Sequence, residues 1–336
     1  MQNFAFGIDL GTGNIKIYNS ADDSILNEKN MIAIQNKNTL FAYGDSAFEM
    51  FEKAPGNIVI SNPVTNGVIA DIKNMQTVLR CFIADLAGSK SSGADYYISV
   101  PTDVTEVEKR SFYDLVRDAN VKAKKIMVVE KAIADGLGLD IDVKNSQGVM
   151  IVDVGYATTE ISILSLGGIV LSKLIKVGGA KFDDAIRAAV RKEFNLMIGQ
   201  KTAEKVKMGM RMLEEAGESA VVYGRDIVTG LPVEREIPTT LVDLALREHF
   251  DTIIDNIKVI LERTPPELAA DIYRHGVYLT GGSAVTNHFG ELVSQGTNLK
   301  VNIADNAADS VACGLARVIK DDKYKSVAYS IQGMSK

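Results

Sequence analysis

One short pattern occurs twice in this chain, and it restricts the fold more than any other feature. An apolar run leads into an Asp-x-Gly turn, and a run that alternates apolar and polar residues follows. The first copy runs Phe4–Ile8 and then Asp9–Asn14, and the second runs Val149–Val152 and then Asp153–Glu160. Three pairs of positions share one constant offset: Asp9 and Asp153, Gly11 and Gly155, Ile17 and Ile161. Each copy predicts a β-hairpin, and the repeat predicts a duplicated architecture with one hairpin opening each half.

The remaining segments alternate between strand and helix patterns. Strands are expected at Tyr96–Val100, Ile126–Val129 and Gly276–Leu279, with a β-ribbon over Ala220–Glu236. Helices are expected at Val107–Asp118, Ala132–Leu137, Lys181–Phe194, Thr202–Glu215 and Leu241–Glu262. Strands that alternate with helices predict an α/β fold, and 336 residues suit about two domains.

Composition excludes several classes of protein. Hydrophobic residues make up 46% and charged residues 24%, which is ordinary globular usage. The net charge of −6 argues against a nucleic-acid partner. Cys81 and Cys313 have no metal-ligand spacing, and no apolar run has the length of a signal peptide or a membrane span. These features predict a cytoplasmic protein.

Three Gly-rich turns follow apolar strands, at Gly11-Thr12-Gly13, Gly155-Tyr156-Ala157 and Gly281-Gly282-Ser283. Glycine lets backbone N–H groups approach an anion without a Cβ in the way. Further polar groups stand beside the turns: Asn14, Lys16, Thr158 and Thr159. Asp9 and Asp153 end their strands there, where carboxylates suit the waters of a Mg²⁺ ion. A single turn of this kind is commonly a plain hairpin, but the duplicated pair and the third turn favour a Mg²⁺-polyphosphate site between two halves.

Phe6–Asn14, Val152–Glu160 and Tyr278–Ser283 resemble the two phosphate motifs and the adenosine motif of the actin, sugar-kinase and Hsp70 superfamily. Other stretches resemble MreB, the bacterial actin homologue of cell shape: Pro55–Ile58, Gly67–Asp71, Gly199–Lys207, Thr229–Pro232 and Leu261–Leu268. The resemblance extends from about Phe6 to Val318.

This resemblance implies an actin-like fold of two domains, each with an RNase H-like core around a nucleotide cleft and a small inserted subdomain. Domain I then comprises residues 1–144 and 312–330, with its subdomain at about 33–72. Domain II comprises residues 145–311, with its subdomain at about 179–243. Glu204 and Lys207 match the polar positions of the family's nucleoside-contacting helix.

The resemblance also implies ATP and Mg²⁺ as ligands, with at most slow ATP hydrolysis. It implies self-assembly into antiparallel double protofilaments at the inner face of the cytoplasmic membrane. Membrane proteins of cell shape and wall synthesis are the implied partners. The family's membrane loop corresponds to Gly88–Ala94, which lacks a large apolar side chain here, and Phe4 is either an anchor or a core residue.

The chain departs from the family at its candidate catalytic positions. Tyr156 and Ala157 replace glycines, and a Cβ at each position crowds the phosphate path. The family has two glutamates near Glu130 and Lys131, the second of which orients the attacking water. Alignment on Ala134 and Gly138 places Lys131 there, whereas a slip of one residue restores Glu130; both readings stay open. Thr159 matches the ending of the family's loop and completes the catalytic candidates.

Three alternatives compete with a filament-forming ATP-binding protein. A small-molecule kinase requires a general-base aspartate and substrate-binding insertions. An Hsp70-like chaperone requires a further substrate domain. A filament regulator with weak or absent hydrolysis is the main rival, because Lys131, Tyr156 and Ala157 all disfavour turnover.

Overall fold

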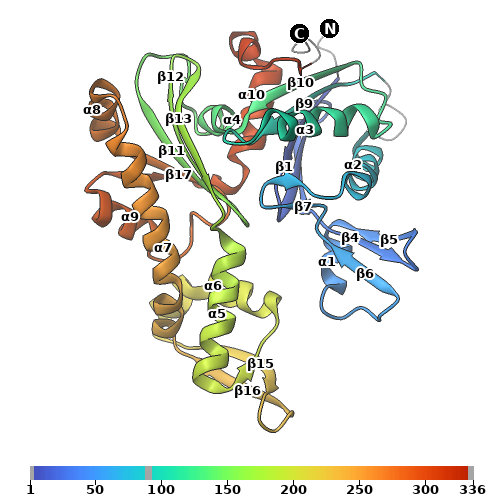
Figure 1. Cartoon of the computed structure of the whole chain (residues 1–336), viewed down its shortest axis with the longest axis vertical. Coiled ribbons are helices and arrows are strands. Elements are labelled where there is room, and N and C mark those ends of the chain that lie inside the picture. The colour runs from blue at the N-terminus through green and yellow to red at the C-terminus, as the bar shows by residue number, and fades with distance from the viewer. Residues whose placement is uncertain (1–3, 88–92, 332–336) are drawn as a thin grey trace.

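A computed structural model describes residues 4–87 and 93–331 (Figure 1). Five residues of the predicted membrane loop Gly88–Ala94, residues 88–92, lie outside the described residues. Phe4 packs against the core, and its ring lies 4.8 Å from that of Phe6 in an edge-on arrangement. The described structure therefore favours the core reading of Phe4.

The first predicted hairpin lies in a five-stranded sheet with the order β10-β9-β1-β2-β3. Its strands are β1 (Ala5–Leu10), β2 (Asn14–Asn19), β3 (Ser24–Lys29), β9 (Asp95–Val100) and β10 (Lys125–Glu130). β1 pairs antiparallel with β2, so that Asp9 lies opposite Lys16, and it pairs parallel with β9. The predicted hairpin is confirmed.

Both faces of this sheet are covered by helices, because successive side chains of a strand point to opposite sides. On one face, Phe6 and Ile8 pack with α2 (Ile72–Ala87) and α3 (Glu106–Asp118). On the other face, Ala5 packs with α4 (Lys131–Gly138) and α10 (Ser310–Lys320). Thr105 begins α3 with the reciprocal capping box that its Glu108 completes.

The second hairpin lies in a second five-stranded sheet with the order β13-β12-β11-β17-β18. Its strands are β11 (Val149–Val154), β12 (Thr159–Ser165), β13 (Gly168–Ile175), β17 (Val277–Thr280) and β18 (Val301–Ile303). β11 pairs antiparallel with β12, so that Asp153 lies opposite Glu160. The duplicated hairpin is confirmed in its register as well as in its position.

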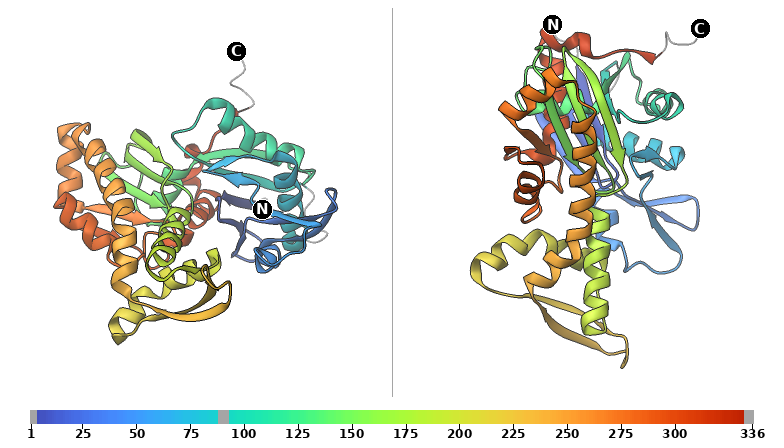
Figure 2. Two further views of the ribbon diagram at one scale, coloured as in Figure 1. Left: turned by 60° about the horizontal axis from the view of Figure 1, so that its bottom comes forward. Right: turned by 60° about the vertical axis from the view of Figure 1, so that its left-hand side comes forward.

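Helices pack around the second sheet and extend below it (Figures 1 and 2). They are α5 (Gly179–Phe194), α6 (Gln200–Ala216), α7 (Thr239–Glu262), α8 (Pro266–His275) and α9 (Phe289–Thr297). Each helix predicted from the sequence is present, with ends that agree within a turn. The turned views of Figure 2 show α7 as a long helix that runs from the second sheet down to the lower extension.

Two smaller lobes hang from the two sheets (Figure 1). One contains β4 (Ile32–Gln35), β5 (Thr39–Tyr43), β6 (Ile58–Ser61) and α1 (Gly44–Met50). The other contains β14 (Leu196–Met197), β15 (Ala220–Asp226) and β16 (Pro232–Ile237) beside α5 and α6. A two-stranded sheet of β7 (Val64–Thr65) and β8 (Val68–Ile69) leads from the first lobe back to the cleft. The exact residue ranges of the two domains stay a prediction.

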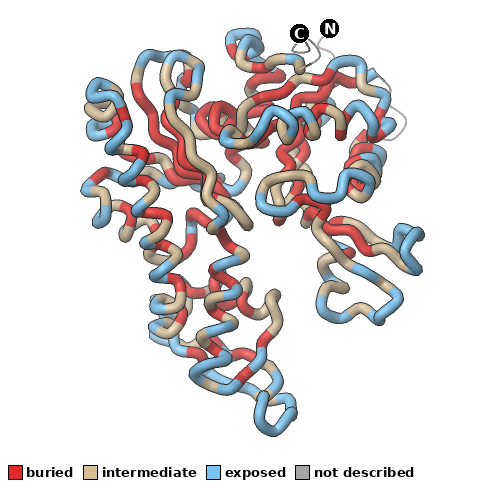
Figure 3. Tube along the Cα trace, in the orientation of Figure 1, coloured by how far each residue is buried: buried red, intermediate tan, exposed pale blue. Residues whose placement is uncertain are grey.

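Burial follows this layered arrangement: the inner strands β1, β9, β11 and β12 are almost wholly buried, and the tips of the lower lobes are exposed (Figure 3). Among the described residues, no helix combines the length and the apolar composition of a membrane span.

The helices α4 and α10 cross at two glycines. A Cβ on Gly138 would lie 1.8 Å from the backbone oxygen of Ser310. A Cβ on Gly314 would lie 1.8 Å from the backbone oxygen of Ala134. The two backbones therefore touch, and only glycine fits at either position.

Candidate functional site: a cleft between the two sheets

A cleft of about 410 Å³ opens where the two hairpin turns face each other. Most sequence-predicted site residues line it: Asp9, Gly11, Thr12, Gly13, Asn14, Lys16, Lys131, Asp153, Gly155, Tyr156, Ala157, Thr158, Glu204, Lys207, Gly281, Gly282 and Ser283. Glu130 and Thr159 do not line it. The fold thus brings the three Gly-rich turns together around one space.

The first turn is held by hydrogen bonds from its own half of the molecule. The Thr12 hydroxyl accepts a bond of 3.0 Å from the backbone N–H of Gly67, in the turn between β7 and β8. The side chain of Asn30 donates to the Gly11 carbonyl over 2.8 Å. Asn14, whose amide donates to Asn27 over 2.7 Å, is held in the same way. These bonds fix the turn, and the Thr12 hydroxyl already accepts a hydrogen bond within the chain.

Tyr156 of the second turn reaches across the cleft to the first turn. A Cβ on Gly13 would lie 2.7 Å from both the Cβ and the Cγ of Tyr156, so the ring lies directly against this glycine. The hydroxyl of Tyr156 is hydrogen-bonded to the side chain of Gln200 at the start of α6. Burial, with the nearby charges of Asp183 and Glu204, raises the pKa of Tyr156 to about 12. The crowding expected from the sequence is therefore a direct contact between the first two Gly-rich turns.

Two features of the third turn exclude any residue but glycine at position 281: the backbone conformation and the lack of room for a Cβ. The φ of Gly281 is +88°, which lies in the left-handed region that favours glycine. A Cβ at this position would lie 2.1 Å from Oδ1 of Asp153. The third turn thus lies directly against the Asp153 carboxylate.

Lys131, the first residue of α4, points into the cleft and forms an ion pair with Asp153. The Nζ–Oδ2 distance is 2.5 Å, and both side chains are largely buried. Burial alone would lower the pKa of Lys131, but the charges of the Asp153, Asp9 and Asp135 carboxylates raise it by more. The net pKa therefore lies above its ordinary value. Lys131 is therefore a cation in the floor of the cleft.

Glu130, the last residue of β10, points away from the cleft. Its Oε1 accepts hydrogen bonds from Lys109 Nζ over 2.9 Å and from the Tyr329 hydroxyl over 2.8 Å. These partners belong to α3 and to the segment after α10, so Glu130 joins two parts of the first half. Of the two alternatives at the water-orienting position, the geometry favours Lys131.

Thr159 also points away, because its hydroxyl donates to the Val177 carbonyl over 2.8 Å and the residue is fully buried. The next residue, Glu160, does line the cleft and accepts a hydrogen bond from Thr102. Burial raises the pKa of Glu160 to about 7, with Lys131 and Thr102 acting in the opposite direction. Glu160 is thus a carboxyl group of the cleft whose charge changes near neutral pH.

The two predicted nucleoside contacts on α6 both line the cleft, and both form ion pairs within the chain. Glu204 accepts a bond of 2.9 Å from Lys29 of β3, which joins the two halves across the mouth of the cleft. Lys207 pairs with the buried Asp183 at 2.6 Å and donates to the Gly179 carbonyl at 3.2 Å. Burial raises the pKa of Asp183 to about 6, against the influence of Lys207.

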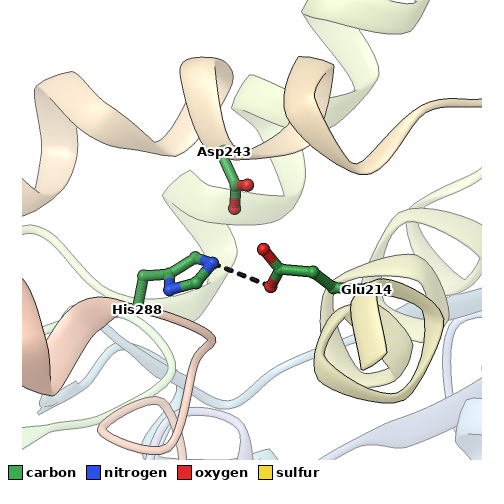
Figure 4. A group of neighbouring side chains, drawn as sticks. All are labelled: Glu214, Asp243 and His288. Carbon is green, nitrogen blue, oxygen red and sulfur yellow. Dashed lines mark ion pairs between the residues drawn. The ribbon is translucent and has the colours of Figure 1, made fainter. Parts of the chain in front are cut away.

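A cluster of polar side chains at the outer end of α6 connects the loop after the third turn to that helix (Figure 4). Glu214 of α6, Asp243 of α7 and His288 before α9 face one another, and His288 Nε2 lies 2.8 Å from a carboxylate oxygen of Glu214. Asn287, which lines the cleft, donates to the same oxygen over 2.7 Å. Because α6 and this loop form two walls of the cleft, the cluster fixes the distance between them.

Both carboxylates predicted to hold a Mg²⁺ ion already face ammonium groups. Asp9 lies 3.8 Å from Lys16 Nζ and accepts a 3.1 Å hydrogen bond from the Ser99 hydroxyl. Asp153 carries the shorter pair with Lys131. A divalent cation at Asp153 would stand beside a buried positive charge, so this donor set does not fit Mg²⁺ while Lys131 holds its place.

Sequence reasoning missed several residues of the site. Asp135 lies one helical turn after Lys131 on α4, and this spacing of i, i+4 was the available signal. Burial, and then the Asp153 charge, raise the pKa of Asp135 above its ordinary value, and its carboxylate accepts a 2.7 Å bond from Ser310. Lys29 and Asp183 carry no local signal, because their partners lie far away in the sequence.

Comparisons with known proteins agree with this arrangement. The sequence profile of the family described as MreB/Mbl protein matches residues 3–326. The cell shape-determining protein Mbl of Bacillus subtilis (strain 168) is 36% identical over 312 residues, which cover 92% of this chain and 93% of Mbl.

Solved structures of similar proteins share the fold. The crystal structure of MreB5 of Spiroplasma citri bound to ADP has a TM-score of 0.89 at 33% identity, and the alignment covers 97% of this chain and 98% of that one. A second structure of MreB5, bound to AMPPNP, gives the same values. The MamK double helical filament has a TM-score of 0.79 at 20% identity, over 95% of this chain and 99% of MamK, and shows the fold alone.

The expected actin-like fold is therefore confirmed, with its two sheets flanked by helices and its cleft between them. The profile match and the identity to Mbl both extend over most of the sequence. This chain belongs to the MreB/Mbl family.

Proposed function

We propose that the chain is an ATP-binding filament protein of cell shape. The observation that carries ATP binding is the convergence of three Gly-rich turns on one cleft, since exposed backbone N–H groups in such turns bind phosphate. Lys16 and Lys131 add positive charge beside the turns. The ADP and AMPPNP complexes of MreB5 support a nucleoside polyphosphate as the ligand.

ATP is expected to raise the melting temperature of the protein, because it binds the folded state. At a concentration of 100 times the Kd, the stabilisation is about 2.7 kcal/mol. Asp9→Ala is expected to remove most of this increase, since Asp9 holds Lys16 and the Ser99 hydroxyl in place beside the first turn. Differential scanning fluorimetry with and without ATP measures both effects.

Two further variants make this test specific. Asp9→Asn keeps the shape of the side chain and is expected to lose the ATP effect with less damage to the fold. Asp251→Ala, on the exposed side of α7, is the matched control and is expected to keep it. A wild-type melting curve that saturating ATP leaves unchanged would show that the cleft does not bind nucleotide.

The proposal extends to self-assembly at the inner face of the cytoplasmic membrane, with membrane proteins of cell shape and wall synthesis as partners. The name of Mbl, a cell shape-determining protein, supports the role in cell shape. The resemblance of most of the chain to MreB supports self-assembly. The second candidate is a filament regulator of the same fold with weak or absent hydrolysis. The position of Lys131 in the cleft floor is the observation that favours it.

At micromolar concentration with ATP, the purified protein is expected to form paired straight filaments that pellet and are visible by negative-stain electron microscopy. An open polymer requires complementary front and back surfaces on one chain, which MreB relatives are expected to share. Nucleotide-free protein and ADP-bound protein are the comparison samples. Monomers alone, across nucleotide states, salt concentrations and added lipid, would favour the regulator.

A further inference from the structure

We propose that the Lys131 ammonium replaces the divalent cation in this cleft, so that ATP binds without requiring Mg²⁺. This inference rests on the proposed function, since it concerns how the same site neutralises the phosphates. It departs from the expectation that Asp9 and Asp153 hold a Mg²⁺ ion through water.

The backbone of Lys131 is held in place by the elements on both sides of it. Its neighbour Glu130 is the last residue of β10 and pairs with Val100 of β9. The helix that Lys131 begins is held against α10 at Gly138 and Gly314, where the backbones touch. The start of α4 therefore cannot retreat from the cleft without separating these two helices.

Asp153, the ion-pair partner of Lys131, is also held in place by its surroundings. Asp153 is the next-to-last residue of β11 and is almost completely buried. It lies so close to Gly281 that a Cβ on that glycine would overlap its Oδ1. The 2.5 Å contact between Lys131 and Asp153 thus joins two fixed elements, one from each half of the molecule. The ammonium group lies at the carboxylate on which the predicted Mg²⁺ site depends.

The surrounding charges favour a cation at this point. The charges of Asp153, Asp9, Asp135 and Glu160 raise the pKa of Lys131, and the contact with Asp153 holds its ammonium group in place. One ammonium group there already offsets part of this negative charge and can donate to a phosphate oxygen as well. A Mg²⁺ ion in the same place would meet the repulsion of Lys131, whereas a phosphate of ATP would meet its attraction.

The test is the affinity of the full-length protein for ATP in Mg²⁺ and in excess EDTA, measured by isothermal titration calorimetry. The wild-type Kd is expected to be nearly equal in both conditions. Lys131→Met keeps the length of the side chain without its charge, and is expected to weaken binding in EDTA roughly 10- to 100-fold, the usual cost of one charge-assisted contact. Added Mg²⁺ is expected to restore much of this loss, because the variant leaves Asp153 free to hold the ion.

Two controls separate charge from damage to the fold. Lys131→Arg keeps the charge and is expected to bind ATP in EDTA. Lys258→Met removes an ammonium group from the exposed face of α7 and is expected to behave as wild type. Circular dichroism melting curves establish that each variant is folded before its affinity is measured.

Wild-type protein that binds ATP only with Mg²⁺ would overturn this inference and leave the proposed function intact. Wild-type protein that binds ATP in neither condition would overturn the proposed function itself. If Lys131→Met binds ATP as tightly as the wild type in both conditions, Lys131 does not supply the charge.

Discussion

Replacing Lys131 by glutamate is expected to raise the rate of phosphate release from ATP. Hydrolysis requires a group that positions the attacking water and accepts its proton, and such a group commonly contributes about 10²–10⁴-fold in rate. A protonated lysine cannot accept that proton, and its charge stabilises bound ATP instead. Because Lys131 points into the cleft beside Asp153, a carboxylate at this position would lie where the family's water-orienting glutamate is expected. A phosphate-release assay under single-turnover conditions measures the difference.

The neighbouring residue supplies the matched control. Glu130→Ala is expected to leave the rate of phosphate release unchanged, because the Glu130 carboxylate binds Lys109 and Tyr329 rather than the cleft. The opposite pattern, with Glu130→Ala slowing the reaction and Lys131→Glu having no effect, would contradict this assignment.

Folding and cation binding must be controlled in the same assay. Lys131→Glu places a new carboxylate beside Asp153, so the measurement contains excess Mg²⁺ for every variant. Lys131→Gln avoids the like-charge contact, and an amide can orient water in phosphoryl transfer. An intermediate rate for Lys131→Gln would separate the orientation of water from the acceptance of its proton.

The parts of the fold that could be predicted are those whose signals are local. Each hairpin carries its apolar run, its turn residues and its alternating run within one short segment, and both hairpins are confirmed in register. The capping box at Thr105 and Glu108 marks the start of α3 in the same local way. Because the two copies share one pattern, their turns could also be expected to face a common cleft.

The helix α10 could not be predicted by the same reasoning. It is buried on most of its surface, including Val311, Leu315 and Val318, so its less buried face is narrow. Its first residue has no side-chain cap, and Gly314 lowers the helix propensity in its interior. The helix is stabilised by contacts with α4 and β1, which are distant in sequence.

The candidate site likewise has features that local residue types predicted and features that depend on the folded chain. Residue types at the turns indicated a phosphate site, but the orientation of Glu130 and Lys131 depends on where β10 ends and α4 begins. Sequence alignment leaves that boundary uncertain by one residue, and one residue exchanges the side chain that faces the cleft. The contact of Tyr156 with Gly13, and the ion pairs of Glu204 and Lys207, join segments that only the folded chain brings together.

Gly314→Ala is expected to destabilise the protein, because it adds a methyl group where the backbones of α4 and α10 touch. The new Cβ would lie 1.8 Å from the backbone oxygen of Ala134, so α4 and α10 would have to move apart. Overpacking of this kind costs about 1–3 kcal/mol, and a contact with backbone rather than a flexible side chain favours the upper end. At roughly 2–4 °C per kcal/mol, the melting temperature should fall by several degrees or more.

Gly209→Ala is the matched control for this prediction. Gly209 also lies inside a helix, α6, but the nearest atom to its added Cβ is a Leu213 methyl group at 3.9 Å. There the change is expected to stabilise the protein by about 0.5–1 kcal/mol, because alanine favours the helix over glycine. Since α4 also carries Lys131, Gly314→Ala is further expected to weaken ATP binding, whereas Gly209→Ala should leave it unchanged. Equal melting temperatures for the two variants would show that α4 and α10 do not touch at Gly314.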